Sequence, residues 1–137
     1  MKRKIKFKAW AIREKRMYIP FDLYDILMEE GSHNPQEDWL FLQWTGLKDK
    51  YYKDIYEGDI VQQRALRLPE ESYCDEEIDY TYIGEVRIIP SKGVCLSHPI
   101  VIDNLEENRT FKCDYNKNVV QYRCEIIGNI YENKELI

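Results

Sequence analysis

Short stretches in which apolar and polar residues alternate run through most of this chain, with turn residues between them. The clearest is VQYRCEI, residues 120–126, whose apolar positions are Val120, Tyr122, Cys124 and Ile126. All four fall on the same face of an extended strand, and we expect that face to be buried. Because short turns rather than long helices join the stretches, the pattern predicts an antiparallel β fold and argues against a parallel α/β sheet.

Other strands are expected on both sides of this one. Residues 110–115 are predicted to pair with 120–126 in a hairpin that turns at Asn116-Lys117-Asn118. Cys113 and Cys124 would then be small packing residues, one on each arm. Further strands are expected at residues 4–12, 17–19, 39–44, 60–68, 84–90, 94–98 and 99–102.

Two segments do not follow the strand pattern. Asp22 can cap a short helix that Gly31 can end, and Leu23, Ile26 and Leu27 lie on one face of that helix. Residues 69–82 are rich in acidic side chains, and we interpret them as a solvated loop. They lack the spacing of an EF-hand calcium site.

A small antiparallel barrel accommodates these strands because closure removes exposed sheet edges. An acidic turn at Gly58-Asp59 would launch an early strand, and Gly84 would let a later strand bend, as in SH3-like barrels. We therefore predict an N-terminal β extension with a short helix over residues 1–45 and an SH3-like barrel over residues 46–137.

The tripeptide Ile-Tyr-Glu occurs twice, at residues 55–57 and 130–132, each time beside a glycine. The flanking residues do not repeat, so we interpret the two copies as structural corners rather than as a duplicated site. If the first and last barrel strands are neighbours, Tyr56 and Tyr131 should pack close together. The residues expected to form turns or close the barrel are Gly46, Gly58, Asp59, Gly84, Gly128 and Tyr131.

Charge is distributed unevenly along the chain. Residues 1–16 carry eight basic side chains and one acidic, whereas the whole chain has a net charge of -5. Lys4, Lys6 and Lys8 alternate with apolar residues, as expected of a strand with one solvated lysine face. The alternative is a basic arm that binds nucleic acid, which the acidic remainder of the chain disfavours.

No motif in the sequence points to catalysis or to a metal. The four cysteines form no Cys-x-x-Cys pair, and we expect free thiols in a reducing compartment. Cys95 and His98 are three residues apart, which on a strand puts their side chains on opposite faces, so a catalytic dyad is not expected. Glu57 and Asp59 could form an acid-base pair, but a turn role for Asp59 is favoured. We predict no catalytic, metal-binding or cofactor-binding residues.

Aromatic residues offer the best candidate for a binding surface. The chain has 11 Tyr and 3 Trp; some of these rings must form the core, and a patch of those left exposed would mark a partner surface. The rings proposed to face a partner are Trp10, Trp44, Tyr51, Tyr52 and Tyr56.

Five motifs together resemble the YopX family of phage and prophage proteins. They are IKFKAW (5–10), QWTGLKDK (43–50), IYEGDIV (55–61), GEV (84–86) and IIGNIYENKELI (126–137). The resemblance implies a small, mostly β protein with an SH3-like barrel in its C-terminal part and no established catalytic residues. Members tend to have Asn-Gly where this chain has Tyr51-Tyr52, so we expect either a longer turn or an interface there; the longer turn is favoured.

These observations lead to one functional hypothesis and one alternative. We expect a non-enzymatic phage or prophage accessory protein that binds a host or phage protein and forms a homo-oligomer. The alternative is a nucleic-acid-binding module that uses the basic N-terminal strand. No apolar run is long enough to span a membrane, and the N-terminus lacks the core of a signal peptide, so we expect a cytoplasmic protein in a bacterial host.

Overall fold

The computed structural model describes residues 5–22, 38–67, 77–107 and 109–137. Most of this part of the chain is strand, so the prediction of a mainly β protein is confirmed. The strands are β1 Lys6–Ala11, β2 Arg16–Asp22, β3 Trp39–Lys48, β4 Asp54–Tyr56, β5 Asp59–Arg67, β6 Ile78–Ile89, β7 Gly93–Asp103, β8 Arg109–Lys112, β9 Lys117–Asn118 and β10 Cys124–Asn129. Two short 3-10 helices also occur, η2 Gln121–Arg123 and η3 Lys134–Leu136.

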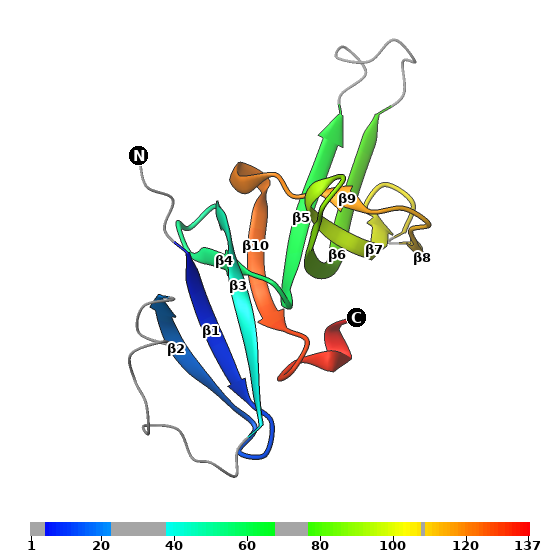
Figure 1. The fold of residues 1–137 in the computed structure, drawn as a ribbon. Helices are drawn as coiled ribbons and strands as arrows, with labels where there is room; N and C mark the ends of the chain where they lie inside the picture. The colour runs from blue at the N-terminus through cyan, green and yellow to red at the C-terminus, as the bar shows by residue number, and fades with distance from the viewer. Residues whose placement is uncertain (1–4, 23–37, 68–76, 108) are drawn as a thin grey trace.

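The strands form two antiparallel sheets (Figure 1). One has four strands in the order β2-β1-β3-β4; the other has six, in the order β10-β5-β6-β7-β8, with β9 paired to β7. The sheets curl into a half-barrel. Gly84 lies at an irregularity in the β6–β7 register, and a Cβ there would be 3.0 Å from the Pro99 side chain. Glycine therefore permits the close approach of β6 and β7 that the curl requires.

Strand β3 belongs to both predicted segments. Its first half pairs with β1, whereas Trp44 and Lys48 pair with Tyr56 and Asp54 of β4. The predicted boundary between residues 45 and 46 falls within this strand. Backbone hydrogen bonds then join the sheets, from Lys50 N to Cys124 O at 2.9 Å and from Gly58 N to Val86 O at 3.0 Å.

The core of the larger sheet gathers side chains from strands that are distant in sequence. Burial, with a smaller contribution from Asp49, raises the pKa of the Cys124 thiol to about 11, so this cysteine is an unreactive packing residue. Among the described residues Cys95, Cys113 and Cys124 are free thiols. The core cluster comprises Ile55, Val61, Tyr82, Val86, Leu96, Val101, Cys113 and Cys124.

The predicted hairpin between residues 110–115 and 120–126 is wrong. Strand β8 pairs with β7, and β10 pairs with β5. The Gln63 side chain donates to Asn118 O at 3.0 Å and accepts from Val120 N at 2.8 Å, which draws the connecting segment across to β5. The alternation also failed for the first half of the segment, because Val120 and Tyr122 are exposed whereas Cys124 is buried.

Two further predictions lie outside the described residues. They are the short helix between Asp22 and Gly31 and residues 69–76 of the acidic loop; the rest of that loop prediction is wrong, because residues 78–82 belong to β6. In the ranges that are described, no helix is long and apolar enough to cross a lipid bilayer.

Candidate binding surfaces

The five aromatic residues proposed to face a partner are divided between interior and exterior. Trp10 and Tyr56 are buried, and Trp44 is half-buried. Tyr51 and Tyr52 are 58% and 83% exposed. The five rings therefore do not form one continuous outer surface.

Packing between the two ends of the chain explains the buried rings. Strand β1 lies between β2 and β3, and Trp10 stacks on Tyr131 with ring centroids 5.5 Å apart. Burial, followed by the charges of Asp54 and Asp59, raises the pKa of Tyr56 to about 12. Trp10 and Tyr56 thus pack inside the protein and cannot form the outer surface expected of them.

The lysines of β1 also make contacts within the molecule. Lys6 Nζ lies 3.2 Å from Asp54 Oδ2 and 4.4 Å from the Trp44 ring centroid. Lys8 Nζ lies 4.5 Å from the Tyr56 ring centroid. This face of β1 is therefore half-buried against aromatic rings rather than fully solvated as expected.

The two copies of Ile-Tyr-Glu meet where the first and last strands of the larger sheet pair. Asp59 and Asn129 are register partners in β5 and β10. Gly58 has φ +85°, and a Cβ placed on it would lie 3.1 Å from the Tyr131 ring. Asp59 Oδ2 accepts a hydrogen bond from Tyr56 N at 2.8 Å. These contacts make the Gly58-Asp59 turn a closure element, with Tyr131 packed against Gly58.

The other residues expected in turns take different positions. Gly46 lies in the irregular part of the β3–β4 pairing, with φ +84° and nothing within 4 Å of the place a Cβ would occupy. At Gly128 a Cβ would lie 2.6 Å from Asn133 Oδ1, which itself accepts from Asn129 N. Gly128 therefore makes room for the turn that follows β10.

The turn between β3 and β4 is fixed by one buried carboxylate. Asp49 N donates to Lys53 O at 2.9 Å, which closes a loop of three residues rather than two. Asp49 Oδ1 accepts from Tyr51 N at 2.9 Å and from Lys53 N at 3.0 Å, while Oδ2 accepts from Ile126 N at 3.2 Å. The turn is thus longer than an Asn-Gly hairpin, and it is tied to β10.

Helix η2 brings a third exposed tyrosine to this turn. Lys48 N donates to Gln121 Oε1 at 3.0 Å, and Tyr122, in the middle of η2, is 88% exposed. Tyr122 was expected on a buried strand face, but the chain is helical there and turns its ring outward. Nothing in the local sequence pattern signalled this helix. We name Tyr51, Tyr52, Tyr122 and the exposed cations Lys48, Lys50, Lys53 and Arg123 the tyrosine surface.

Tyr52 adopts a conformation that tyrosine rarely takes, with φ +65°. We predict that Tyr52→Gly raises the free energy of unfolding by about 0.5 to 1 kcal/mol, because glycine removes the backbone strain. Urea unfolding measures the change. Tyr51→Gly is the control, since Tyr51 has no positive φ, and it should lower stability. A loss of stability in Tyr52→Gly would contradict the prediction.

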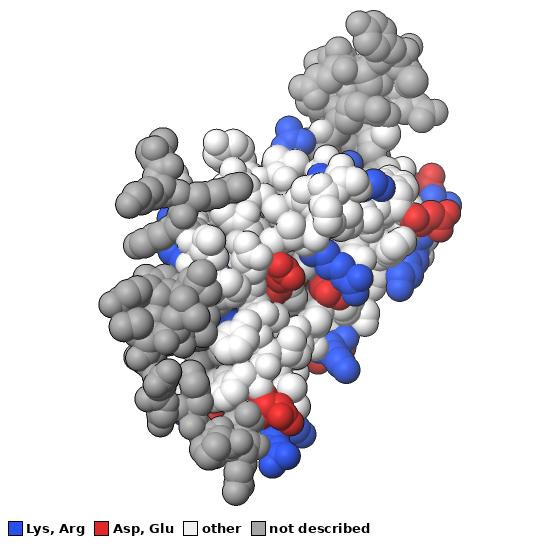
Figure 2. Space-filling view, in the orientation of Figure 1, with Lys and Arg blue, Asp and Glu red and all other residues white. Residues whose placement is uncertain are grey.

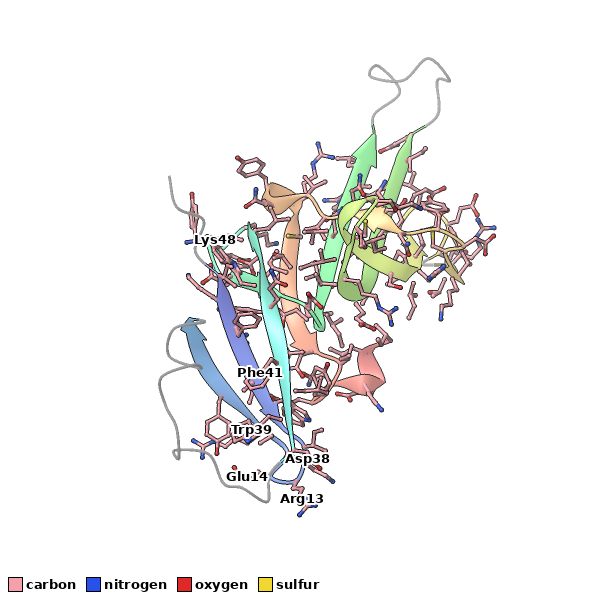
Figure 3. All side chains as sticks on the ribbon, viewed as in Figure 1. Arg13, Glu14, Asp38, Trp39, Phe41 and Lys48 are labelled. Carbon is pink, nitrogen blue, oxygen red and sulfur yellow. The ribbon has the colours of Figure 1, made fainter. Side chains whose placement is uncertain are left out.

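An apolar groove of about 270 Å³ lies between β3 and β6. Leu40, Phe41 and Ile88 are exposed apolar residues in its lining, and Tyr131 also contributes to it. Figure 3 labels Phe41 on β3, and Figure 2 shows uncharged surface over that part of the strand. Sequence analysis missed the groove because it assigned residues 39–44 to a buried strand. The charged residues in its lining are Glu57, Glu85 and Arg87.

A larger groove of about 710 Å³ borders β6, β7 and the C-terminal residue. His98 and Cys113 both line it, and His98 is exposed. Cys95, which precedes His98 by three residues, is buried with its Sγ 3.3 Å from Asn118 Oδ1. Cys95 and His98 therefore lie in different environments. Across the described ranges no three histidine, cysteine or carboxylate side chains gather as a metal site.

The fold and these surfaces define a small antiparallel β protein, curled into a half-barrel, with an apolar groove and an aromatic turn on its exterior. Within that class the chain belongs to the YopX family, because the family described as YopX protein matches residues 6–137. The resemblance inferred from the five motifs is confirmed.

The solved structures similar to this chain include the crystal structure of protein EF1440 from Enterococcus faecalis. It is 23% identical in sequence, the match covers 96% of each chain, and the TM-score is 0.48. Among curated proteins, none matches the chain.

Proposed function

We propose that this YopX protein is a non-enzymatic accessory protein of a phage or prophage that acts by binding protein, first of all a second copy of itself. The apolar groove between β3 and β6 carries the proposal. Exposed apolar residues ringed by charged ones are typical of protein contact surfaces. The free thiols at Cys95, Cys113 and Cys124 suit a reducing compartment such as the bacterial cytoplasm.

The charges around the groove suit a contact between identical copies. Arg87 Nε donates to Glu85 Oε2 at 3.1 Å, and Glu57 also lines the groove, so the rim carries both signs. In a two-fold contact the same patch meets itself, and Arg87 of one copy can approach a carboxylate of the other. Burial already raises the pKa of Glu57, so a cation from a second copy would stabilise its charged form.

The non-enzymatic part of the proposal rests on the structural roles of the reactive groups. The Asp59 carboxylate holds the turn before β5 through Tyr56 N. Asp79 pairs with Arg64 at 2.6 Å and accepts from Asn104 Nδ2 at 3.0 Å. Each group is used to fix the fold, and neither is presented to a substrate.

Binding of nucleic acid through β1 is less well supported. Lys6 is engaged with Asp54 and Trp44, and Lys8 lies over Tyr56. Phosphates would have to displace these contacts. We therefore do not place a nucleic-acid site on β1.

Ile88→Glu tests self-association. We expect the variant to be a monomer where the wild type is an oligomer, because the substitution replaces an exposed apolar residue of the groove lining with a charge. Light scattering coupled to size-exclusion chromatography measures the mass. Leu105→Glu is the control, since Leu105 is an exposed apolar residue outside the groove lining, and its mass should equal that of the wild type. A wild type that is monomeric at about 1 mM, where even a contact of about 4 kcal/mol is half formed, contradicts the proposal.

A further inference from the structure

The tyrosine surface combines exposed aromatic rings with clustered basic side chains. Proteins that hold single-stranded nucleic acid without reading its sequence use this combination, because bases stack on the rings while phosphates bind the cations. We propose that the tyrosine surface binds single-stranded DNA or RNA. Lys50 Nζ lies 5.1 Å from the Tyr51 ring centroid, so one face of that ring already holds a cation. The bases stack on Tyr52, on Tyr122 and on the other face of Tyr51, and the phosphates lie along Lys53 and Arg123.

The rings are carried by a fixed platform. The three hydrogen bonds that Asp49 accepts hold the backbone of Tyr51 and Lys53 and connect the turn to β10. The bond from Lys50 N to Cys124 O places the turn beside the residue that follows η2. Because this backbone is already ordered, binding a strand would cost little conformational entropy.

The local charge favours an anionic ligand although the whole chain has a net charge of -5. Lys48 Nζ lies 4.0 Å from Asp54 Oδ1, and Lys50 Nζ lies 3.6 Å from Glu125 Oε2. With Asp49, whose carboxylate holds the turn, four basic side chains stand against three carboxylates, and the surface keeps a net charge of +1. At physiological salt, charges more than about 8 Å away are largely screened, so this local excess governs a contact with phosphates.

The tyrosine surface differs from the apolar groove, which is why we assign it a different ligand. The groove has Leu40 and Ile88 in its lining and charges of both signs, as a protein contact does. The tyrosine surface offers flat rings and mainly positive charge. The two surfaces begin at opposite ends of β3, near Phe41 and Lys48 (Figure 3).

The backbone of Tyr52 supports a role in contact rather than in stability. Its ring is held outward from a position with φ +65°, where glycine would be less strained. A side chain that weakens the fold and remains exposed is explained if its ring binds something.

Fluorescence anisotropy of a labelled oligothymidylate of about 16 nucleotides, titrated with the full chain, tests the proposal. We expect Tyr52→Ala and Tyr122→Ala each to weaken binding by roughly 5- to 100-fold, the loss of one stacked base. Lys53→Ala and Arg123→Ala should each lower the slope of log affinity against log salt by about 0.7.

Two control variants carry the same residue changes elsewhere. Tyr115→Ala removes another exposed tyrosine, and Lys92→Ala removes an exposed lysine at the β6–β7 turn; both should bind as the wild type does. Ile88→Glu should also bind normally, which separates this site from self-association. Circular dichroism of every variant establishes that it is folded.

Several results would overturn the proposal. One is the absence of binding at about 20 mM salt, where phosphate contacts are strongest. Others are equal losses in the control variants, or tighter binding of duplex than of single strand. Displacement by polyglutamate as readily as by unlabelled oligothymidylate would show that the surface responds to charge alone and suits an acidic polypeptide.

Discussion

Gly58→Ala is expected to lower the free energy of unfolding by about 2 to 4 kcal/mol. Gly58 has φ +85°, a conformation that strains any residue with a Cβ. The added methyl group would also lie 3.1 Å from the Tyr131 ring and 3.7 Å from Ile130 Cγ1. Overpacking of this kind costs about 1 to 3 kcal/mol in addition to the backbone strain.

The backbone hydrogen bonds of Gly58 prevent the turn from moving away from the Tyr131 ring. Gly58 N donates to Val86 O at 3.0 Å, and Gly58 O accepts from Ile130 N at 2.9 Å. The residue therefore bonds β6 on one side and the segment after β10 on the other. Relief of the clash would require one of these bonds to lengthen.

Gly46→Ala and Gly93→Ala are matched controls for Gly58→Ala. Both glycines have φ +84°, and neither has an atom within 4 Å of the position a Cβ would occupy. Each substitution should therefore cost only the backbone strain, about 1 kcal/mol. Chemical denaturation of the three variants separates strain from packing. If Gly58→Ala costs no more than the controls, Tyr131 does not pack against this turn as the structure shows.

Local signals in the sequence predicted the Gly58-Asp59 turn and most strands, whereas the hairpin turn expected at residues 116–118 is wrong. The first and last strands of the larger sheet were expected to be neighbours, and β5 and β10 do pair, although the sheet remains open between β10 and β8. A glycine followed by an acidic residue predicts a turn, because few other residues tolerate the backbone angles that the turn requires. Such a signal depends only on the residue itself and those beside it.

The tyrosine surface and the apolar groove could not be predicted because both depend on contacts between distant segments. Tyr122 is exposed because η2 interrupts the expected strand, and Gln63, far away in sequence, holds the segment before it. Trp10 is buried because Tyr131 covers it. Alternation shows which residues share a face, but the element that covers each face is set by the topology.

Asp59→Asn is expected to change how stability depends on pH. The Asp59 side chain is buried, with the residue 3% exposed, and burial raises its pKa from 3.8 to about 6. The hydrogen bond from Tyr56 N and the charge of Lys8 lower the pKa, but not enough to offset burial, and Asp49 raises it further. The folded protein therefore binds this proton more tightly than the unfolded chain does.

The sign of the effect follows from that difference. Below about pH 4 the carboxyl is protonated in both states, and its contribution to folding is fully present. As the pH rises through about 6, the folded state must hold a buried charge, and the contribution of the protonated Asp59 carboxyl to the free energy of unfolding is lost. A shift of about two pKa units corresponds to about 3 kcal/mol. The wild type should lose this amount relative to Asp59→Asn between pH 4 and pH 7.

Urea unfolding of both proteins at several pH values measures the difference directly. Asparagine keeps an oxygen that can accept from Tyr56 N but carries no charge, so any constant offset from the substitution cancels in the comparison. The raised pKa of Glu57 acts in both proteins and cancels as well.

Asp79→Asn is the control for Asp59→Asn because the pKa of Asp79 is shifted in the opposite direction. The hydrogen bonds from Arg64 and Asn104 lower the pKa of Asp79 to about 2. Its contribution to stability is present above about pH 4 and is lost only as the pH falls toward 2, so Asp79→Asn should change stability by a constant between pH 5 and pH 7. If the wild type and Asp59→Asn keep parallel profiles from pH 4 to pH 7, the Asp59 carboxylate is solvated in solution. The turn that connects β4 of the smaller sheet to β5 of the larger sheet would then be open rather than closed.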